Sequence, residues 1–293
     1  MTKRRVLAML ACGVLTAGLL TGCGGSSSDT AGADDAEITV VSREDGSGTR
    51  GAFVELFGVQ DEDDKGEKTD MTTEDATITS STEVVMTTVA GNKNAIGYCS
   101  LGSLNDTVKA VKIDGVEATV DNINNGKYAI SRPFNIATNG TPSEVTQDFI
   151  NYILSEDGQK IVEENGYIKA SDAGAFKSNG AKGKIVVAGS SSVSPVMEKL
   201  IEAYKAVNKN AEIELQTTDS TTGMTSTIDG SYDIGMASRE LKDDEAAELD
   251  NQVIATDGIA VIVNKNNTAD ELSSDQVKAI YTGEALTWDE VLN

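Results

Sequence analysis

Apolar residues recur along this chain in two alternating patterns. Short runs rich in valine and isoleucine, which are typical of strands, occupy residues 38–41, 184–189, 211–216 and 258–264. Between them, apolar residues recur at helical spacing over residues 143–155, 194–207 and 273–283. The second of these helices has Pro195 at its first position, and Gly283 is expected to end the third. Strand and helix in alternation predict an α/β fold with mostly parallel sheets.

The first 36 residues predict an export signal and a tether. Three cations precede an uncharged stretch over 6–21, which is too short to span a membrane. Small residues before Cys23 resemble the lipobox of bacterial lipoproteins. We therefore expect a signal peptide over 1–22, a lipidated Cys23 and a flexible tether over 23–36. An ordinary cleaved signal with an incidental cysteine is the alternative.

Composition limits what the rest of the chain can do. The formal charge is −23, and loss of the three cations in residues 1–22 would make it −26. Nucleic acid is therefore not expected as a partner, because it requires a basic face. Histidine is absent, so triads that use histidine and zinc sites that use histidine ligands cannot form. We expect no metal and no cofactor, and we expect Cys99 to be a small buried residue.

Hydroxyl-rich segments follow three of the predicted strands. The sequence "GSSSVSP" offers Ser191 and Ser192 before a helix, "DSTTG" offers Ser220 and Thr221, and "GSGT" offers Ser47, Gly48 and Thr49. A serine cap alone would explain any single one of these. Unpaired amides and the helix dipole favour an anion at a helix start, however, and strand ends converge in open α/β sheets. Three such turns together predict an anion site.

Arg43, just upstream of the third turn, adds a cation to this set. A guanidinium forms paired hydrogen bonds to an oxyanion, which neutral donors cannot match. Asp45 is expected to hold Arg43 in place through a salt bridge. The alternative is that both are ordinary surface charges.

Six segments resemble the phosphate-binding proteins of ABC phosphate importers, a branch of the type II periplasmic binding proteins. They read "SREDGSGTR", "AIGYCSLGSL", "AGSSSVSP", "DSTTGMTSTIDGSYDIGMASREL", "ATDGIAVIVN" and "IYTGEALTW". Usual members of that family begin with the segment like "AGSSSVSP", whereas this chain begins with "SREDGSGTR". The order resembles a circular permutation, with new ends between Asn293 and Glu37. A truncated tandem protein is the alternative.

The resemblance implies a two-lobed fold with a ligand cleft between hinged lobes. Two crossing strands are expected in "KYAISRPFNIA" and "GIAVIVNKNN". Lobe one would comprise residues 130–262. Lobe two would comprise mainly residues 37–129, completed by residues 263–293.

The resemblance also implies the ligand-binding residues. These are Arg43, Ser47, Gly48 and Thr49 from lobe two, and Ser191, Ser192, Ser220 and Ser238 from lobe one. The family places a proton-accepting aspartate after the serine that Ser238 matches, but this chain has Arg239 there. Asp257 or Glu240 could substitute, and Thr221 could support the site.

The implied function is an extracytoplasmic lipoprotein that captures inorganic phosphate and delivers it to the permease of an ABC importer. We expect a monomer anchored by lipid to the outer face of the bacterial cell membrane. Other tetrahedral oxyanions (sulfate, molybdate or tungstate) and a phosphate-sensing surface receptor are the alternatives. An enzyme is not expected, because the serines of "GSSSVS" have no lysine or carboxylate at a spacing typical of a catalytic base.

Overall fold

The computed structural model describes residues 37–63, 66 and 68–293. The predicted signal peptide, the tether and Cys23 lie outside the described residues. Within the described ranges, no helix is both long enough and apolar enough to cross a membrane. We keep the names lobe one and lobe two for the residue ranges given above.

The elements of lobe two come from both ends of the described chain. Its strands are β1 (Thr39–Arg43), β2 (Gln60–Glu62), β3 (Lys68–Asp70), β4 (Thr77–Thr79), β5 (Ala95–Ser100), β6 (Val108–Ala110), β7 (Lys112–Ile113) and β14 (Glu271–Leu272). Its helices are α1 (Gly48–Leu56), α2 (Thr82–Gly91), the 3-10 helix η1 (Leu101–Ser103), α3 (Val120–Asn124), α9 (Ser274–Thr282) and α10 (Trp288–Leu292).

The elements of lobe one are continuous in the sequence. Its strands are β8 (Ser131–Thr138), β9 (Ile168–Lys169), β10 (Gly183–Ser190), β11 (Ala211–Thr218), β12 (Ile234–Ala237) and β13 (Asp250–Asn264), whose last residues continue into lobe two. Its helices are α4 (Glu144–Leu154), α5 (Glu156–Glu164), α6 (Ser194–Val207), α7 (Ser220–Ile228) and α8 (Asp243–Glu248). The predicted helices over 143–155, 194–207 and 273–283 are confirmed as α4, α6 and α9. Gly283 ends α9 in the left-handed conformation, with φ 76°.

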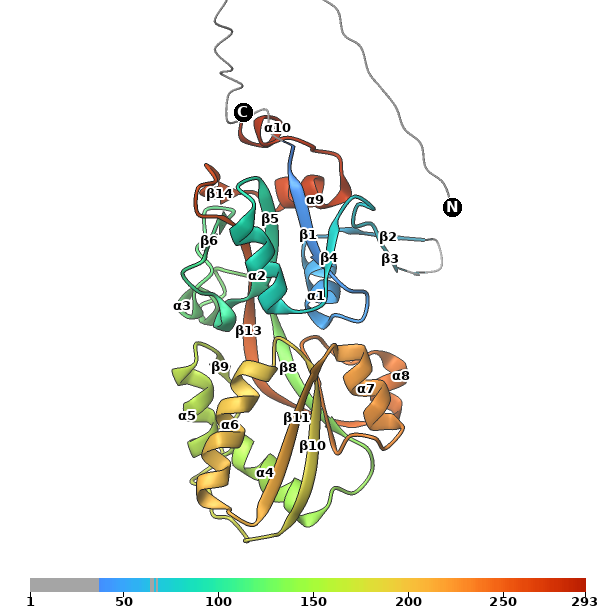
Figure 1. Cartoon of the computed structure of the whole chain (residues 1–293), viewed down its shortest axis with the longest axis vertical. Helices are drawn as coiled ribbons and strands as arrows, with labels where there is room; N and C mark the ends of the chain where they lie inside the picture. Colours follow the sequence, from blue (N-terminus) through green and yellow to red (C-terminus); the bar gives the residue numbers. More distant parts are fainter. Residues whose placement is uncertain (1–36, 64–65, 67) are drawn as a thin grey trace, which may run out of the picture. The chain divides into compact units, whose positions relative to one another are not determined.

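The main sheet runs through both lobes in the order β11-β10-β12-β8-β13-β5-β1-β4. Pairs inside a lobe, such as β10 with β11 and β1 with β5, are parallel. The pairs made by β8 and β13 are antiparallel. β13 pairs with β8 up to Gly258 and with β5 from Ile259 onward, so these two long strands cross between the lobes (Figure 1). The predicted boundary at 130 lies one residue before β8, and the one at 262 lies in the part of β13 that pairs with β5; these lobe boundaries stay a prediction.

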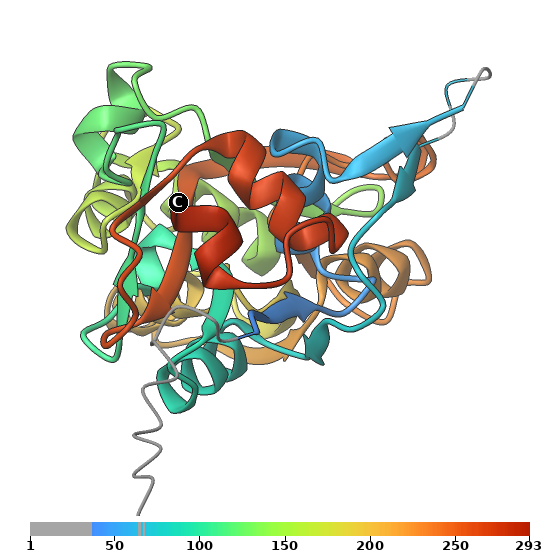
Figure 2. The same cartoon turned by 90° about the horizontal axis from the view of Figure 1, so that it is seen from above.

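Each lobe has its own apolar core. In lobe two, β1, α1, α9 and α10 contribute residues such as Phe53, Tyr281 and Trp288 to one cluster. In lobe one, α4, α6 and β10 build another, with Phe149 and Leu200 fully buried. Figure 2 shows α9 and α10 in red on the end of lobe two. Burial of these side chains fixes the strands whose ends carry the polar turns.

The start and the end of the described chain lie side by side. The backbone amide of Ile38 donates to the carbonyl of Leu286 at 2.8 Å, and Glu37 forms an isolated bridge with Thr287. The two ends of the described chain are therefore in contact.

Candidate functional site

Four helices begin at the edge where the lobes meet. α1, α2, α6 and α7 follow β1, β4, β10 and β11, and each has a hydroxyl residue in or beside its first turn. Serine or aspartate caps the starts of α1, α2 and α7: Ser47, Ser81 and Asp219 each accept a hydrogen bond from a backbone amide of the first turn. The positive ends of four helix dipoles therefore point toward one region.

Arg43 brings a buried cation to this region. It is the last residue of β1 and is 1% exposed. Its Nη2 donates to Ser191 Oγ at 3.1 Å, and its Nη1 donates to Thr82 Oγ1 at 3.4 Å. Ser191 belongs to lobe one and Thr82 to lobe two, so the guanidinium contacts both.

A chain of hydroxyl groups continues from Arg43 through the lobe interface. Thr49 Oγ1 lies 2.8 Å from Ser192 Oγ and 3.4 Å from Ser238 Oγ, while Thr82 Oγ1 lies 2.9 Å from Ser192 Oγ. All four of these residues are at least 96% buried.

Two further serines complete this group from the lobe-one side. Ser190 Oγ donates to Ser238 Oγ at 2.9 Å, and Ser220 Oγ accepts from the amide of Ser238 at 3.1 Å. We call the following residues the hydroxyl cluster: Arg43, Thr49, Thr82, Ser190, Ser191, Ser192, Ser220 and Ser238.

Glycine allows α1 to approach lobe one this closely. A Cβ atom at Gly48 would overlap Ser220 Oγ and lie 2.9 Å from Ser238 Oγ. Two residues earlier, the carbonyl of Gly46 accepts a hydrogen bond from the amide of Thr221 at 3.1 Å. The turn "DGSGT" therefore packs its backbone directly against the start of α7.

The structure brings most of the predicted ligand-binding residues together. Six are members of the hydroxyl cluster: Arg43, Thr49, Ser191, Ser192, Ser220 and Ser238. Ser47 caps α1 and Gly48 begins it, and both are buried beside the cluster. That these residues bind a ligand stays a prediction.

The expected salt bridge between Asp45 and Arg43 is wrong. The carboxylate of Asp45 instead accepts from Arg50 Nη1 at 2.8 Å, and its side chain is 97% exposed. Arg43 pairs with Glu44, at 2.6 Å from Nη2 and 2.8 Å from Nε. The strand ends at Arg43, so the turn directs the Glu44 side chain back to Arg43 and the Asp45 side chain toward solvent.

Arg239 and Asp257 have partners outside the hydroxyl cluster. Arg239 forms two hydrogen bonds of 2.7 Å with the Glu245 carboxylate, and its Nη2 donates to Thr221 Oγ1 at 3.3 Å. Thr221 is thus a partner of Arg239.

Asp257 pairs with Arg132 at 3.0 Å on the crossing strands, where both side chains are almost fully buried. Burial raises the pKa of Asp257, while the charge of Arg132 lowers it. Among the predicted substitutes for a proton acceptor, Asp257 is therefore engaged in an internal ion pair.

Sequence reasoning missed three residues of the site. Glu44 was passed over in favour of Asp45, and Ser190 was not singled out from its neighbours. Thr82 was overlooked although "SSTEVV" contains the same signal as the other turns, a hydroxyl group between a short strand and a helix. Strand β4 has only three residues, of which one is apolar, so the sequence predicts no strand there.

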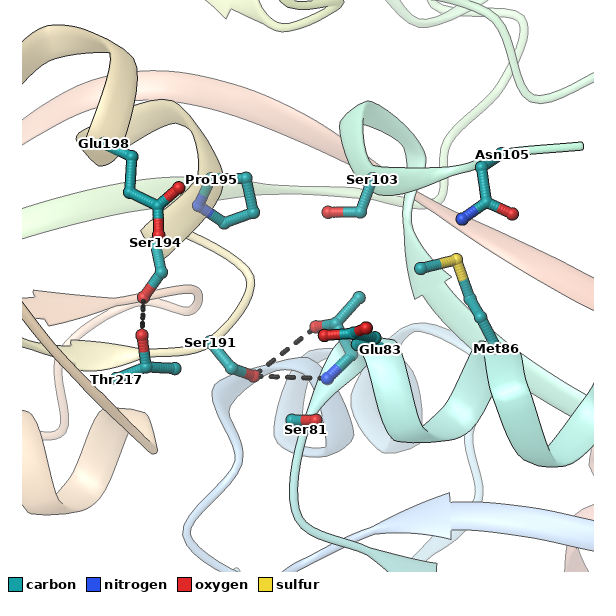
Figure 3. Close-up of a pocket in the computed structure, with 11 residues that line it drawn as sticks. Ser81, Glu83, Met86, Ser103, Asn105, Ser191, Ser194, Pro195, Glu198 and Thr217 are labelled. Carbon is teal, nitrogen blue, oxygen red and sulfur yellow. Dashed lines mark hydrogen bonds between the residues drawn. The ribbon is translucent and has the colours of Figure 1, made fainter. Parts of the chain in front are cut away.

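A pocket of about 530 Å³ borders the hydroxyl cluster. Figure 3 shows Ser191 beside its wall, with Ser194, Glu198 and Thr217 of lobe one on one side and Glu83, Ser103 and Asn105 of lobe two on the other. The side chains that line it are mainly hydroxyl, amide and carboxylate groups. Ser191 and Thr82 of the hydroxyl cluster therefore form part of the pocket wall.

The hydroxyl cluster offers hydrogen-bond donors and positive potential, which together suit an anion. Buried donors of this kind favour an oxygen-rich ligand that can satisfy several of them at once. In the described part of the chain, no group of three or more cysteine and carboxylate residues is arranged to hold a metal ion.

Comparison with known proteins identifies the family. A model of the PBP superfamily domain matches residues 26–157 and 174–293. The phosphate-binding protein PstS 2 of Streptococcus agalactiae serotype V is 54% identical over 99% of each chain. The chain belongs to the PBP superfamily, in the family of this phosphate-binding protein. The predicted family and the two-lobed α/β fold are confirmed.

A solved structure supports the same assignment within the PBP superfamily. The phosphate-binding protein of a phosphate ABC transporter from Streptococcus pneumoniae is 44% identical, with a TM-score of 0.70. The match covers 87% of this chain and all of that one. By contrast, the phosphate-binding protein PstS of Staphylococcus saprophyticus is 38% identical over 126 residues, which is 40% of either chain.

Proposed function

We propose that this protein binds inorganic phosphate in the cleft between its lobes, at the hydroxyl cluster. The observation that carries the proposal is the direct contact of Arg43 and Thr49 of lobe two with Ser191 and Ser192 of lobe one. The full-length similarity to phosphate-binding proteins supports it independently. Phosphate presents four oxygen atoms, so one ion can accept from both lobes and hold them together.

The energy that such binding needs is modest for a site of this composition. A micromolar dissociation constant corresponds to about −8 kcal/mol. Several charge-assisted hydrogen bonds from buried donors can supply that amount, because each contributes roughly 1.5–3 kcal/mol.

Isothermal titration of the purified protein with phosphate tests the proposal. We expect one phosphate per chain, and Arg43→Ala should abolish or greatly weaken the heat signal because the guanidinium is lost. Ser47→Ala should weaken binding too, since the cap of α1 is lost. Absence of heat with phosphate, together with binding of a different anion, would refute the assignment.

A second candidate ligand class is another tetrahedral oxyanion, such as sulfate, molybdate or tungstate. The observation in its favour is the pairing of Arg239 with Glu245, which places a paired cation after Ser238 instead of a carboxylate. Sulfate, arsenate and molybdate belong in the same titration series, and the tightest ligand decides between the classes.

We also propose that the protein works outside the cytoplasm and delivers phosphate to the permease of an ABC importer. The export pattern of residues 1–22 and the family support this. Lipid attachment at Cys23 is part of the proposal, and the test is mass spectrometry of the first tryptic peptide from membranes. An unmodified peptide that begins elsewhere would exclude the lipid anchor.

We infer that the segment order is circularly permuted and that the lobes hinge about β8 and β13. The adjacent ends at Glu37 and Thr287 support the permutation, as does the family match, which is interrupted between 157 and 174. The partial alignment with the Staphylococcus saprophyticus protein agrees with two halves in exchanged order. The Streptococcus agalactiae relative shares the order of this chain over its whole length.

A further inference from the structure

The Glu44 carboxylate forms a bidentate ion pair with one side of the buried Arg43 guanidinium. Its two carboxylate oxygens accept from Arg43 Nε at 2.8 Å and from Nη2 at 2.6 Å. The Arg43 side chain is 2% exposed and that of Glu44 is 25% exposed. Two parallel hydrogen bonds between planar groups fix the orientation of both.

The backbone makes this contact between sequence neighbours possible. Neighbouring side chains within a strand point to opposite faces, but β1 ends at Arg43. The amide of Glu44 donates to the carbonyl of Thr79 at 3.0 Å, and its carbonyl accepts from the amide of Ser47 at 2.9 Å. Glu44 is thus anchored on both sides before its side chain turns back.

This ion pair leaves the other side of the Arg43 guanidinium directed at the hydroxyl groups of the cluster. Nη1 donates to Thr82 and Nη2 also donates to Ser191. We propose that Glu44 is a positioning residue of the anion site: it orients the Arg43 guanidinium so that Nη1 and the second N–H of Nη2, which here contact Thr82 and Ser191, face the ligand. The inference rests on the proposed function, because it concerns the same site.

Position and charge predict opposite effects for the loss of Glu44. If Glu44 acted only through its negative charge, its removal would strengthen the binding of an anion. If it positions Arg43, its removal frees the guanidinium to adopt other rotamers and weakens binding. Asp45 is the matched control, because it carries the same charge one residue later but pairs with Arg50.

The experiment measures phosphate affinity by isothermal titration for the wild type and for Glu44→Ala, Glu44→Gln and Asp45→Ala. We expect Glu44→Ala to weaken binding on the order of 10- to 100-fold, the range typical when a group that orients a ligand-binding side chain is lost. Glu44→Gln keeps one acceptor oxygen and should fall between the wild type and Glu44→Ala. Asp45→Ala should stay within about twofold of the wild type.

A double substitution separates positioning from a general structural role. In the Arg43→Ala background, Glu44→Ala should cause no further loss of affinity, because the group that it positions is gone. Binding that is unchanged or tighter in Glu44→Ala would overturn the inference. So would an equal loss in both backgrounds, or an equal loss in Asp45→Ala.

A second readout keeps this test apart from the test of the proposed function. If the wild type binds no phosphate, the proposed function fails, and the affinity series is repeated with the anion that does bind. Thermal unfolding without ligand gives the Arg43–Glu44 coupling in every case. We expect the losses of stability in Arg43→Ala and Glu44→Ala to be non-additive in the double variant. Strict additivity would contradict the ion pair between the two residues.

Discussion

Gly48→Ala is the substitution that most directly tests the closeness of the two lobes. Gly48 is the first residue of α1, and its backbone does not require the left-handed conformation. Alanine therefore suits this helix better than glycine does, by up to about 1 kcal/mol. The added methyl group would, however, overlap Ser220 Oγ and lie 2.9 Å from Ser238 Oγ, both in lobe one.

The magnitude follows from the cost of overpacking. Extra methyl groups in a well-packed interior cost about 1–3 kcal/mol. If the lobes open without ligand, the clash exists only in the closed arrangement, so the whole cost appears in the affinity. Since about 1.4 kcal/mol corresponds to a factor of ten, phosphate binding should weaken by about 5- to 150-fold. The thermal stability of the ligand-free protein should stay equal or rise.

Gly51→Ala is the matched control, one turn later in the same helix. A Cβ atom there would lie 3.8 Å from Arg239 Cδ, which is ordinary van der Waals contact. Isothermal titration and thermal unfolding of both variants decide the matter. The reasoning is refuted if Gly48→Ala binds phosphate as tightly as Gly51→Ala does, or if its loss of affinity is matched by a loss of ligand-free stability.

Three further predictions concern buried groups that are not members of the hydroxyl cluster. Asp257→Asn leaves Arg132 without its charged partner and should lower the free energy of unfolding by about 3–5 kcal/mol in denaturant titration; a loss below about 1 kcal/mol would contradict this. Burial raises the pKa of Tyr98 from 10.0 to about 12, so its contribution to stability is present below pH 10 and is lost as the pH rises to about 12. The decline in unfolding free energy over that range should therefore be smaller in Tyr98→Phe by about 3 kcal/mol, and identical declines would exclude it. Burial also raises the pKa of the Cys99 thiol to about 12, so an aromatic disulfide reagent at pH 8 should label Cys99 only after unfolding; rapid labelling of the folded protein would disprove its burial.

The elements that the sequence predicted best are those whose pattern is strong and local. α6 carries five apolar residues at helical spacing and a proline in its first turn, and it forms over the predicted residues 194–207. α9 has a serine cap and a terminal glycine, and the structure shows both. Such signals act within a few residues and need no knowledge of the rest of the fold.

The parts that could not be predicted depend on where the backbone leaves its strand. Glu44 and Asp45 are adjacent acids, and composition cannot tell which one meets Arg43. The bond from the Glu44 amide to Thr79 on the neighbouring strand decides it. Thr82 is similar, because it begins α2 directly after β4, a strand of three residues without a clear apolar pattern. Long-range pairing determined both positions, and a single sequence does not display long-range pairing.

An acidic protein can build an anion site because local groups outweigh the net charge. The chain carries 47 acidic and 24 basic residues, yet salt screens exposed charges beyond about 8–10 Å. The hydroxyl cluster lies at the starts of four helices, whose dipoles are positive there, and it contains the buried Arg43 guanidinium. The carboxylate of Glu44 lies on the far side of that guanidinium and is neutralised by it. We therefore expect the surface charge to set the long-range repulsion that phosphate meets on approach, and the buried donors to set how tightly the proposed site holds it.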